Sequence, residues 1–187
     1  RRNTCATNRK NDIMIQVSED IILSPLSVDD IFKIFNTLNN EREYMREWLP
    51  FVDSTKEMED TSNYVNYVLQ THDKQYTISY QGKFVGLIGF KDTDPGNKKT
   101  EIGYWLSQYE QGKGIMIRSV QKLLDYAYSE LDMNRVQIKV AVANHKSRRI
   151  PEKIGFVEEG VERDGELLVD NVFTDIVIYS LLKKEYF

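Results

Sequence analysis

Apolar residues recur at intervals of three and four along residues 115–131, which is the spacing of one face of an α-helix. Similar intervals predict three further helices over residues 31–40, 55–71 and 147–154. These four segments are separated by shorter runs with a different periodicity. The pattern therefore predicts a protein that mixes helices with strands.

Two of the predicted helices carry local start and stop signals. Ser27 and Asp30 stand three residues apart just before the first helical run, a spacing typical of a capping box. Gly155 follows the last predicted helix and is expected to end it. The second helix is expected to bury one apolar face, made by Tyr64, Val65, Val68 and Leu69.

Short runs of alternating or continuous apolar residues predict the strands. They cover residues 21–26, 75–80, 84–90, 100–106, 135–142, 156–161 and 172–182. The order is a strand, two helices, three strands, a helix, a strand, a helix and two strands. We therefore expect the α/β class, with a mixed α+β sheet in a single domain over residues 13–187.

Composition narrows the functional classes. Residues 1–12 are polar and are interpreted as a disordered leader or a cloning remnant. The net charge of -4 disfavours nonspecific binding to nucleic acid, and no apolar run has the ~20 residues of a membrane helix. The single cysteine, Cys5, excludes a disulfide framework and favours a reducing, cytoplasmic location. His72 and His145 stand apart, so no metal site is expected.

A polar loop at residues 107–114 connects a strand to the most clearly predicted helix, over residues 115–131. Gly112 and Gly114 would let a ligand phosphate approach main-chain N–H groups at the helix start, with Lys113 adding positive charge. A Walker A loop is excluded because Gly114 occupies the position of the required Ser or Thr. A Rossmann fingerprint is excluded because Ile117 stands where a third small residue is needed. An ordinary loop-to-helix turn stays open.

This loop resembles the acetyl-CoA pyrophosphate loop of the GNAT superfamily of N-acetyltransferases. Gly112 and Gly114 match the two small positions of that motif, whereas Tyr109 stands where Gln or Arg is usual. The resemblance implies that main-chain groups of five residues hold the diphosphate of acetyl-CoA. They are Gln111, Gly112, Lys113, Gly114 and Ile115.

Further segments resemble the subgroup that acetylates the N-terminal serine or alanine of ribosomal proteins. The matching segments are the apolar loop 48–51, the strand 102–106, the Asn-x-x-Ser run 144–147 and the Glu-Lys-x-Gly-Phe run 152–156. The resemblance implies the GNAT acyl-CoA N-acyltransferase fold, a central, mostly antiparallel sheet flanked by helices. It also implies coenzyme contacts from Trp105, Leu106, Asn144 and Ser147.

The same resemblance suggests two catalytic residues. Ser147 stands where the subgroup has its signature serine and would serve the departing thiolate, while Glu166, in the loop between the last two strands, would be the base. Asn144 and Ser147 are also good helix caps, so that interpretation stays open. Pro151 leaves the orientation of Ser147 undetermined. Alternative bases nearby are Asp164, Asp170 and Asp175.

The expected reaction is transfer of acetyl from acetyl-CoA to the N-terminal amine of a ribosomal or other protein. A small amine, such as a polyamine, amino sugar or antibiotic, is the first alternative acceptor, and a noncatalytic CoA-binding module is the second. An open acidic groove near Glu166 would favour a basic peptide, and a closed pocket would favour a small amine. A homodimer is expected from the resemblance.

Overall fold

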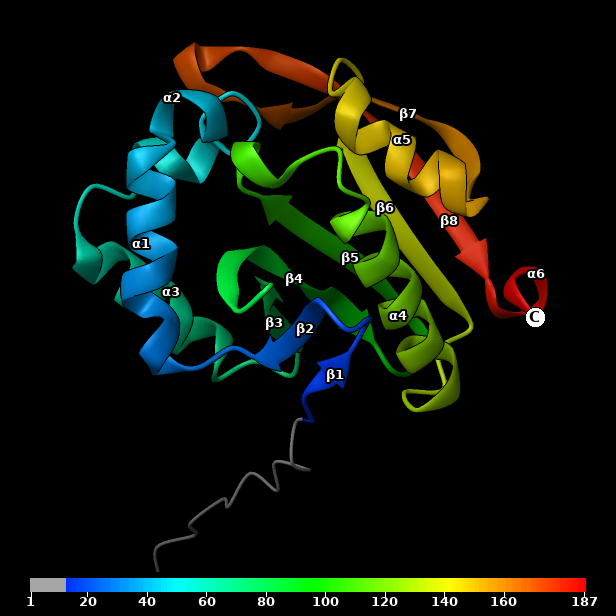
Figure 1. Ribbon diagram of the computed structural model, residues 1–187. Helices are drawn as coiled ribbons and strands as arrows, with labels where there is room; N and C mark the ends of the chain where they lie inside the picture. The colour runs from blue at the N-terminus through cyan, green and yellow to red at the C-terminus, as the bar shows by residue number, and fades with distance from the viewer. Residues whose placement is uncertain (1–12) are drawn as a thin grey trace, which may run out of the picture.

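The computed structural model describes residues 13–187, in which one mixed sheet runs through the molecule (Figure 1). The leader predicted at residues 1–12 lies outside the described residues. The strand order is β1-β2-β3-β4-β5-β6-β8-β7. The strands are β1 (Ile15–Gln16), β2 (Ile21–Pro25), β3 (Gln75–Tyr80), β4 (Lys83–Asp94), β5 (Lys99–Leu106), β6 (Arg135–Ala141), β7 (Val157–Leu167) and β8 (Phe173–Leu182).

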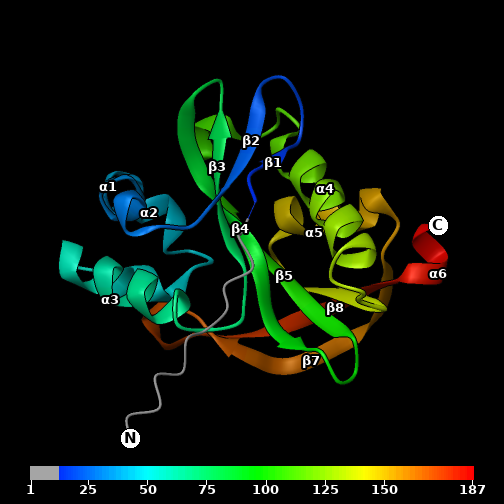
Figure 2. The same cartoon turned by 90° about the horizontal axis from the view of Figure 1, so that it is seen from below.

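Helices cover both faces of this sheet (Figure 2). They are α1 (Ile31–Asn40), α2 (Arg42–Met45), α3 (Met58–Val68), α4 (Ile115–Ser129), α5 (His145–Ile154) and α6 (Lys183–Tyr186). Short 3-10 turns are η1 (Val28–Asp30), η2 (Pro50–Asp53), η3 (Gln108–Glu110) and η4 (Val169–Asn171). Helices α1 to α3 lie on one face, while α4 and α5 lie on the other. The predicted α/β class, with a mostly antiparallel sheet flanked by helices, is confirmed.

Each face has its own apolar cluster. On the α4 side, Val120, Leu124 and Ala127 are fully buried against the sheet, as the periodicity predicted. On the other side, Ile34 and Leu38 of α1 pack with α3 and β4. Two packed layers thus hold the sheet rigidly between them.

One strand pairing sets up the functional region. The sheet is antiparallel throughout except where β5 and β6 run parallel. That pairing covers Lys99–Glu101 and residues 135–137, after which β5 stays with β4 and β6 stays with β8. The two halves of the sheet therefore diverge from Ile102 onward. Main-chain groups along that edge of β5 can pair with an extended ligand.

The structure changes several predicted boundaries. β1 was not predicted, because a two-residue strand has too short a pattern to detect. Helix α3 covers Met58–Val68 rather than residues 55–71. Its buried row is Thr61, Val65 and Val68, so the prediction for Tyr64 is wrong: Tyr64 lies beside this row and is 44% exposed. Tertiary contacts determine which row of side chains along the helix is buried.

The last hairpin is longer than predicted. β7 runs to Leu167 rather than stopping at residue 161, because pairing with β8 resumes after a register shift, with Glu166 opposite Thr174. The segment is rich in charge and glycine, so its sequence resembles a loop. Main-chain hydrogen bonds to β8 override that local preference.

Candidate active site

Two adjoining pockets occupy the space where the sheet diverges. The first, which we call the loop pocket, has a volume of about 620 Å³ and lies between the loop before α4 and the helix α5. The second, the carboxylate pocket, has a volume of about 710 Å³ and contains Glu101 and Glu166. Six residues line both pockets: Trp48, Leu49, Tyr104, Trp105, Asn144 and Ser147. The pockets therefore meet along the diverging edge of β5.

The start of α4 forms one wall of the loop pocket. Gly112 and Gly114 have φ values of 77° and 73°, and Gly114 is the N-cap of the helix. The first N–H groups of a helix have no partner within it, and they carry a partial positive charge. Residues lining the pocket here include Gln111, Gly112, Gly114 and Ile115. The wall is suited to a phosphate group.

Lys113, in contrast, directs its charge elsewhere. Its Nζ lies 2.5 Å from Glu110 Oε2 and 5.4 Å from the centre of the Tyr80 ring. The hydrogen bond to Glu110 raises the pKa of Lys113. The residues lining the pocket include its neighbours but not Lys113. Its expected side-chain role at the phosphates thus has no support from this geometry, whereas its main chain stays beside the helix start.

Three basic side chains that sequence reasoning missed line the opposite wall. Lys146, Arg149 and Lys153 of α5 are exposed and face the loop pocket. Their spacing of three and four along one helix face could have revealed them. Together with the α4 N-terminus they make a positively charged environment, which an anionic ligand would complement.

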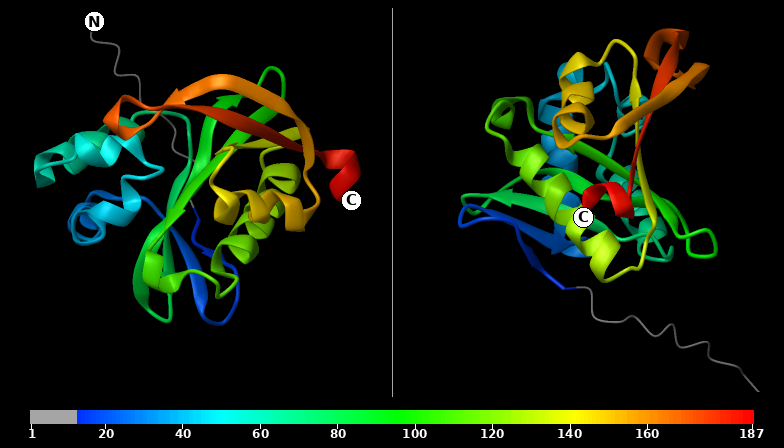
Figure 3. Two further views of the ribbon diagram at one scale, coloured as in Figure 1. Left: turned by 90° about the horizontal axis from the view of Figure 1, so that it is seen from above. Right: turned by 90° about the vertical axis from the view of Figure 1, so that its right-hand side faces the viewer.

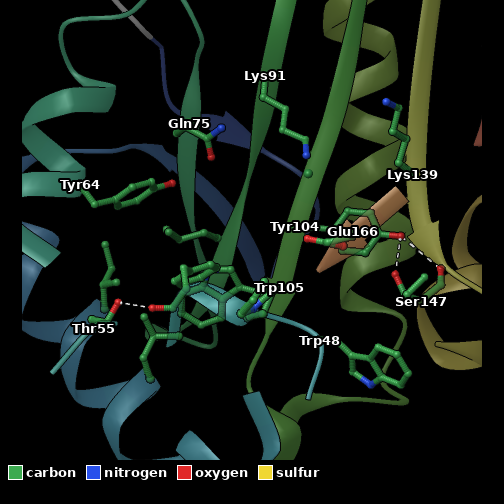
Figure 4. A pocket seen from close by; sticks show the side chains of 18 of the residues that line it. Trp48, Thr55, Tyr64, Gln75, Lys91, Tyr104, Trp105, Lys139, Ser147 and Glu166 are labelled. Carbon is green, nitrogen blue, oxygen red and sulfur yellow. Dashed lines mark hydrogen bonds between the residues drawn. The ribbon is translucent and has the colours of Figure 1, made fainter. Parts of the chain in front are cut away.

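Asn144 caps α5, and Ser147 lies in its first turn. The Asn144 Oδ1 accepts a hydrogen bond from the Ser147 N–H at 3.2 Å. The helix was expected to begin at residue 147, but it begins at His145 because this cap satisfies a free donor. The Ser147 Oγ lies 3.2 Å from the hydroxyl of Tyr104 (Figure 4). Both residues lie where the two pockets meet.

Trp105 and Leu106 continue β5 beside this junction. Trp105 lines both pockets and packs edge-on against Phe84, with ring centres 6.0 Å apart. Leu106 lines the loop pocket. Their positions along the diverging edge allow their main chain to face a ligand that lies between β5 and β6.

Glu166 lies in the carboxylate pocket but not in a loop. It is on β7, opposite Thr174 of β8, so its predicted location in a connecting loop is wrong. The residue is exposed along its strand, while its carboxyl faces the pocket (Figure 4). Burial of that carboxyl raises its pKa, Lys91 opposes the shift and Glu101 reinforces it. A raised pKa is typical of a group that accepts protons near neutral pH.

Glu101 is a second carboxylate, which sequence reasoning missed. It is 2% exposed, with Oε1 2.8 Å from Lys91 Nζ and Oε2 3.2 Å from Gln137 Nε2. Lys91 and Lys139 line the same pocket. No sequence spacing brings these residues to Glu166, since they come from β4, β5 and β6.

Two of the alternative acids of this region, Asp170 and Asp175, have other partners. Asp175 accepts the main-chain N–H of Asp164 at 2.9 Å, within the β7–β8 hairpin. Asp170 accepts from Arg46 at 3.1 Å, and Arg46 also pairs with Asp53 at 2.7 Å. This clasp of Arg46 with Asp53 and Asp170 ties η2 and the end of α2 to η4, at the far end of the hairpin. The ribbon views in Figure 3 show this end of the hairpin beside the N-terminal helices. Glu166 is the acid of this stretch that lines the carboxylate pocket.

The sequence matches a known protein family. Residues 20–157 match the model of the acetyltransferase (GNAT) domain. The chain belongs to the GNAT acetyltransferase family. This confirms the predicted family, and it makes the protein an N-acetyltransferase that takes its acetyl group from acetyl-CoA.

This GNAT enzyme is similar to several known proteins. It is 36% identical to YdaF of Bacillus subtilis (strain 168), which is named for ribosomal N-acetyl transfer, over 91% of this chain and 96% of YdaF. RimL, a ribosomal L7/L12 alpha-N-protein acetyltransferase solved with coenzyme A, is 26% identical with a TM-score of 0.87. That match covers 91% of this chain and 98% of RimL. The spermidine N(1)-acetyltransferase of Vibrio cholerae serotype O1 (strain ATCC 39315 / El Tor Inaba N16961) is 26% identical over 91% of this chain and 97% of the relative.

Two features are absent from the part of this enzyme that the structure describes. Among residues 13–187, no helix has both the length and the apolar character that crossing a membrane requires. In the same range, no three His, Cys, Asp or Glu side chains gather as metal ligands would.

Proposed function

We propose that this enzyme acetylates the N-terminal amine of a protein, with a ribosomal protein as the expected acceptor. The observation that carries the proposal is the meeting of the two pockets at Tyr104 and Ser147. One pocket suits a phosphate-bearing coenzyme, and the other presents a carboxyl group with a raised pKa. The similarity to YdaF and RimL supports a protein amine as acceptor.

In this proposal the loop pocket holds acetyl-CoA. Main-chain N–H groups between Gln111 and Ile115 bind the diphosphate, and Lys146, Arg149 and Lys153 neutralise phosphate charge. The pantetheine arm lies along the free edge of β5 at Trp105 and Leu106. This position of the pantetheine arm directs the thioester toward Ser147.

The chemistry then follows from the two pockets. Glu166 accepts a proton from the acceptor ammonium, directly or through a water, which leaves a neutral amine. The amine nitrogen attacks the thioester carbonyl carbon, the C–N bond forms and the C–S bond breaks. The Ser147 hydroxyl donates a hydrogen bond to the departing sulfur, and the proton released from nitrogen balances formation of the free thiol.

The charges of the carboxylate pocket bear on which peptide fits. Lys91 and Lys139 line it together with Asp60, Glu101 and Glu166. Because the lining carries both positive and negative groups, a uniformly basic peptide has no electrostatic advantage there. A peptide that begins with a small polar residue, such as serine, suits this mixed lining better.

A panel of acceptors tests the proposal. The purified protein would be mixed with acetyl-CoA and, separately, with a peptide bearing a free N-terminal serine, with spermidine and with an amino sugar. Release of free thiol measures turnover, and mass spectrometry locates the acetyl group. We expect the highest kcat/KM with the peptide, acetylated on its α-amine.

Other results would select the alternatives. Preference for spermidine would support the small-amine alternative, which the similarity to the spermidine enzyme favours. Tight coenzyme binding without turnover on any amine would support a noncatalytic module. We also infer a cytoplasmic location and a homodimer, the latter to be tested by light scattering.

A further inference from the structure

Helix α5 contains a proline at a position where another residue would donate a main-chain N–H hydrogen bond within the helix. In an α-helix the N–H of residue 151 would bond the carbonyl of residue 147. Pro151 lies inside α5 and has no N–H. The carbonyl of Ser147 therefore lacks its usual helical donor, and a group from outside the helix can bind it.

The hydroxyl of Tyr104 supplies that group. It reaches across from β5 to α5 and donates to the Ser147 carbonyl oxygen at 3.2 Å (Figure 4). The same hydroxyl oxygen lies 3.2 Å from the Ser147 Oγ. A carbonyl can only accept, so the single proton of Tyr104 points to it. The tyrosine oxygen is then the acceptor for the Ser147 hydroxyl.

We propose that Tyr104 is a positioning residue that holds the Ser147 side chain at the junction of the pockets, and that Pro151 makes this contact available. The inference rests on the proposed role of Ser147 toward the coenzyme sulfur. A phenolic oxygen is a weaker acceptor than a thiolate, so the serine proton can turn to the sulfur when charge develops there.

Without Tyr104, the serine hydroxyl would have local alternatives. A serine in a helix can bond a carbonyl of the preceding turn, which turns its Oγ toward its own backbone. Burial raises the pKa of Tyr104. Its hydroxyl therefore keeps the proton that it donates to the Ser147 carbonyl at neutral pH. The hydrogen bond from Tyr104 to the Ser147 carbonyl is thus expected not to depend on pH near neutrality.

The first test is Tyr104→Phe, assayed with acetyl-CoA and the serine peptide. We expect kcat to fall roughly three- to tenfold, the range of one lost hydrogen bond, while both KM values stay within about twofold. Tyr67→Phe, an exposed residue of α3, is the matched control and should leave kcat unchanged. A Tyr104→Phe enzyme with normal kcat, or with raised KM alone, would overturn the inference.

Double variants separate positioning from general damage. In a Ser147→Ala background, Tyr104→Phe should cause no further loss of kcat, because its effect passes through the serine. Pro151→Ala restores an N–H that competes for the Ser147 carbonyl, so kcat should fall, but not in the Tyr104→Phe background. Additive losses in either pair would refute the corresponding part of the inference.

The single variants Ser147→Ala and Tyr104→Phe distinguish an error in the role of Ser147 from an error in the role of Tyr104. If Ser147→Ala keeps full kcat, the role of Ser147 itself is wrong. If Ser147→Ala is impaired while Tyr104→Phe is not, only the positioning role is wrong. A crystal structure of Tyr104→Phe with coenzyme A gives a readout that needs no turnover: we expect a changed Ser147 rotamer, and an unchanged one would overturn the inference.

Discussion

At the scale of single residues, Glu166 shows how surroundings tune a carboxyl group. Its pKa is raised chiefly by burial, with a further increase from the negative charge of Glu101 and an opposing effect from Lys91. Its basic form therefore becomes available at a higher pH than for an ordinary glutamate. If Glu166 is the base, the acid limb of the kcat/KM profile reports this shifted pKa.

Replacing Glu101 tests this electrostatic link. Glu101→Gln removes the like charge, so the pKa of Glu166 should fall and the acid limb should move to lower pH. Glu166→Gln should instead lower kcat/KM at neutral pH by about 10²-fold or more and flatten that limb. Glu130→Gln, at an exposed position after α4, is the control. An acid limb that survives in Glu166→Gln would assign the base elsewhere.

At the scale of elements, the start of α4 combines backbone conformation with binding. Gly114 has a φ of 73°, and an added Cβ would meet no atom closer than Arg118 Nε at 4.0 Å. An alanine there would be strained by its backbone rather than by crowding. The glycine thus allows the left-handed cap that exposes the helix N–H groups.

Gly114→Ala should raise the Kd for coenzyme A about tenfold and cost about 1 kcal/mol of stability. Gly82→Ala is a matched control, because Gly82 has a φ of 78° and open space around it in the β3–β4 turn. Both variants should lose similar stability in urea titrations. Calorimetry should show weaker coenzyme binding for Gly114→Ala alone, and equal binding by both variants would contradict the proposed diphosphate site.

The clasp of Arg46 with Asp53 and Asp170 works at the same scale. It joins the apolar loop, whose Trp48 and Leu49 line both pockets, to the turn of the last hairpin. Asp170→Asn should loosen the loop and raise the KM for the peptide about two- to fivefold, because the loop must then be ordered on binding. The KM for acetyl-CoA should change less. Asp164→Asn, in the same hairpin, is the comparison, and equal effects would argue against the clasp.

At the scale of the whole molecule, side-chain contacts add to the main-chain pairing that holds β6, β8 and β7 together. Glu159 of β7 pairs with Arg135 of β6 at 2.5 Å and accepts from Ser180 of β8 at 2.8 Å. The Arg135 and Ser180 hydrogen bonds lower the pKa of Glu159 from 4.5 to about 2. This contact joins the three strands of that half of the sheet, at the end of β6 that pairs with β5.

The lowered pKa of Glu159 predicts in which direction the stability of the fold changes with pH. A depressed carboxyl pKa stabilises the fold above the unfolded pKa of 4.5, and that contribution disappears as the pH falls through about 2. Because the side chain is 40% exposed, we expect about 1 kcal/mol after solvent screening. Urea unfolding from pH 7 to about pH 2 should show a smaller acid loss for Glu159→Gln than for the wild type. Glu162→Gln, with a 3.9 Å contact to Lys139, should keep the wild-type acid loss.

Local patterns in the sequence determined a large part of this architecture. The apolar row of α4, the β3–β4 hairpin and the capping pair Ser27 and Asp30 were predicted because each depends on neighbours within a few residues. The same holds for the glycine loop before α4. The family was also predictable, since its motifs follow one another along the chain.

The tertiary structure alone decided which distant residues meet. Glu101, Lys91 and Lys139 join Glu166 through pairing among β4 to β8, and Tyr104 meets Ser147 across the diverging edge of β5. The length of β7 likewise came from its partner strand rather than from its own charged sequence. Periodicity reports which side of an element is apolar, whereas the relative placement of elements depends on packing and long-range hydrogen bonds, which no local pattern contains.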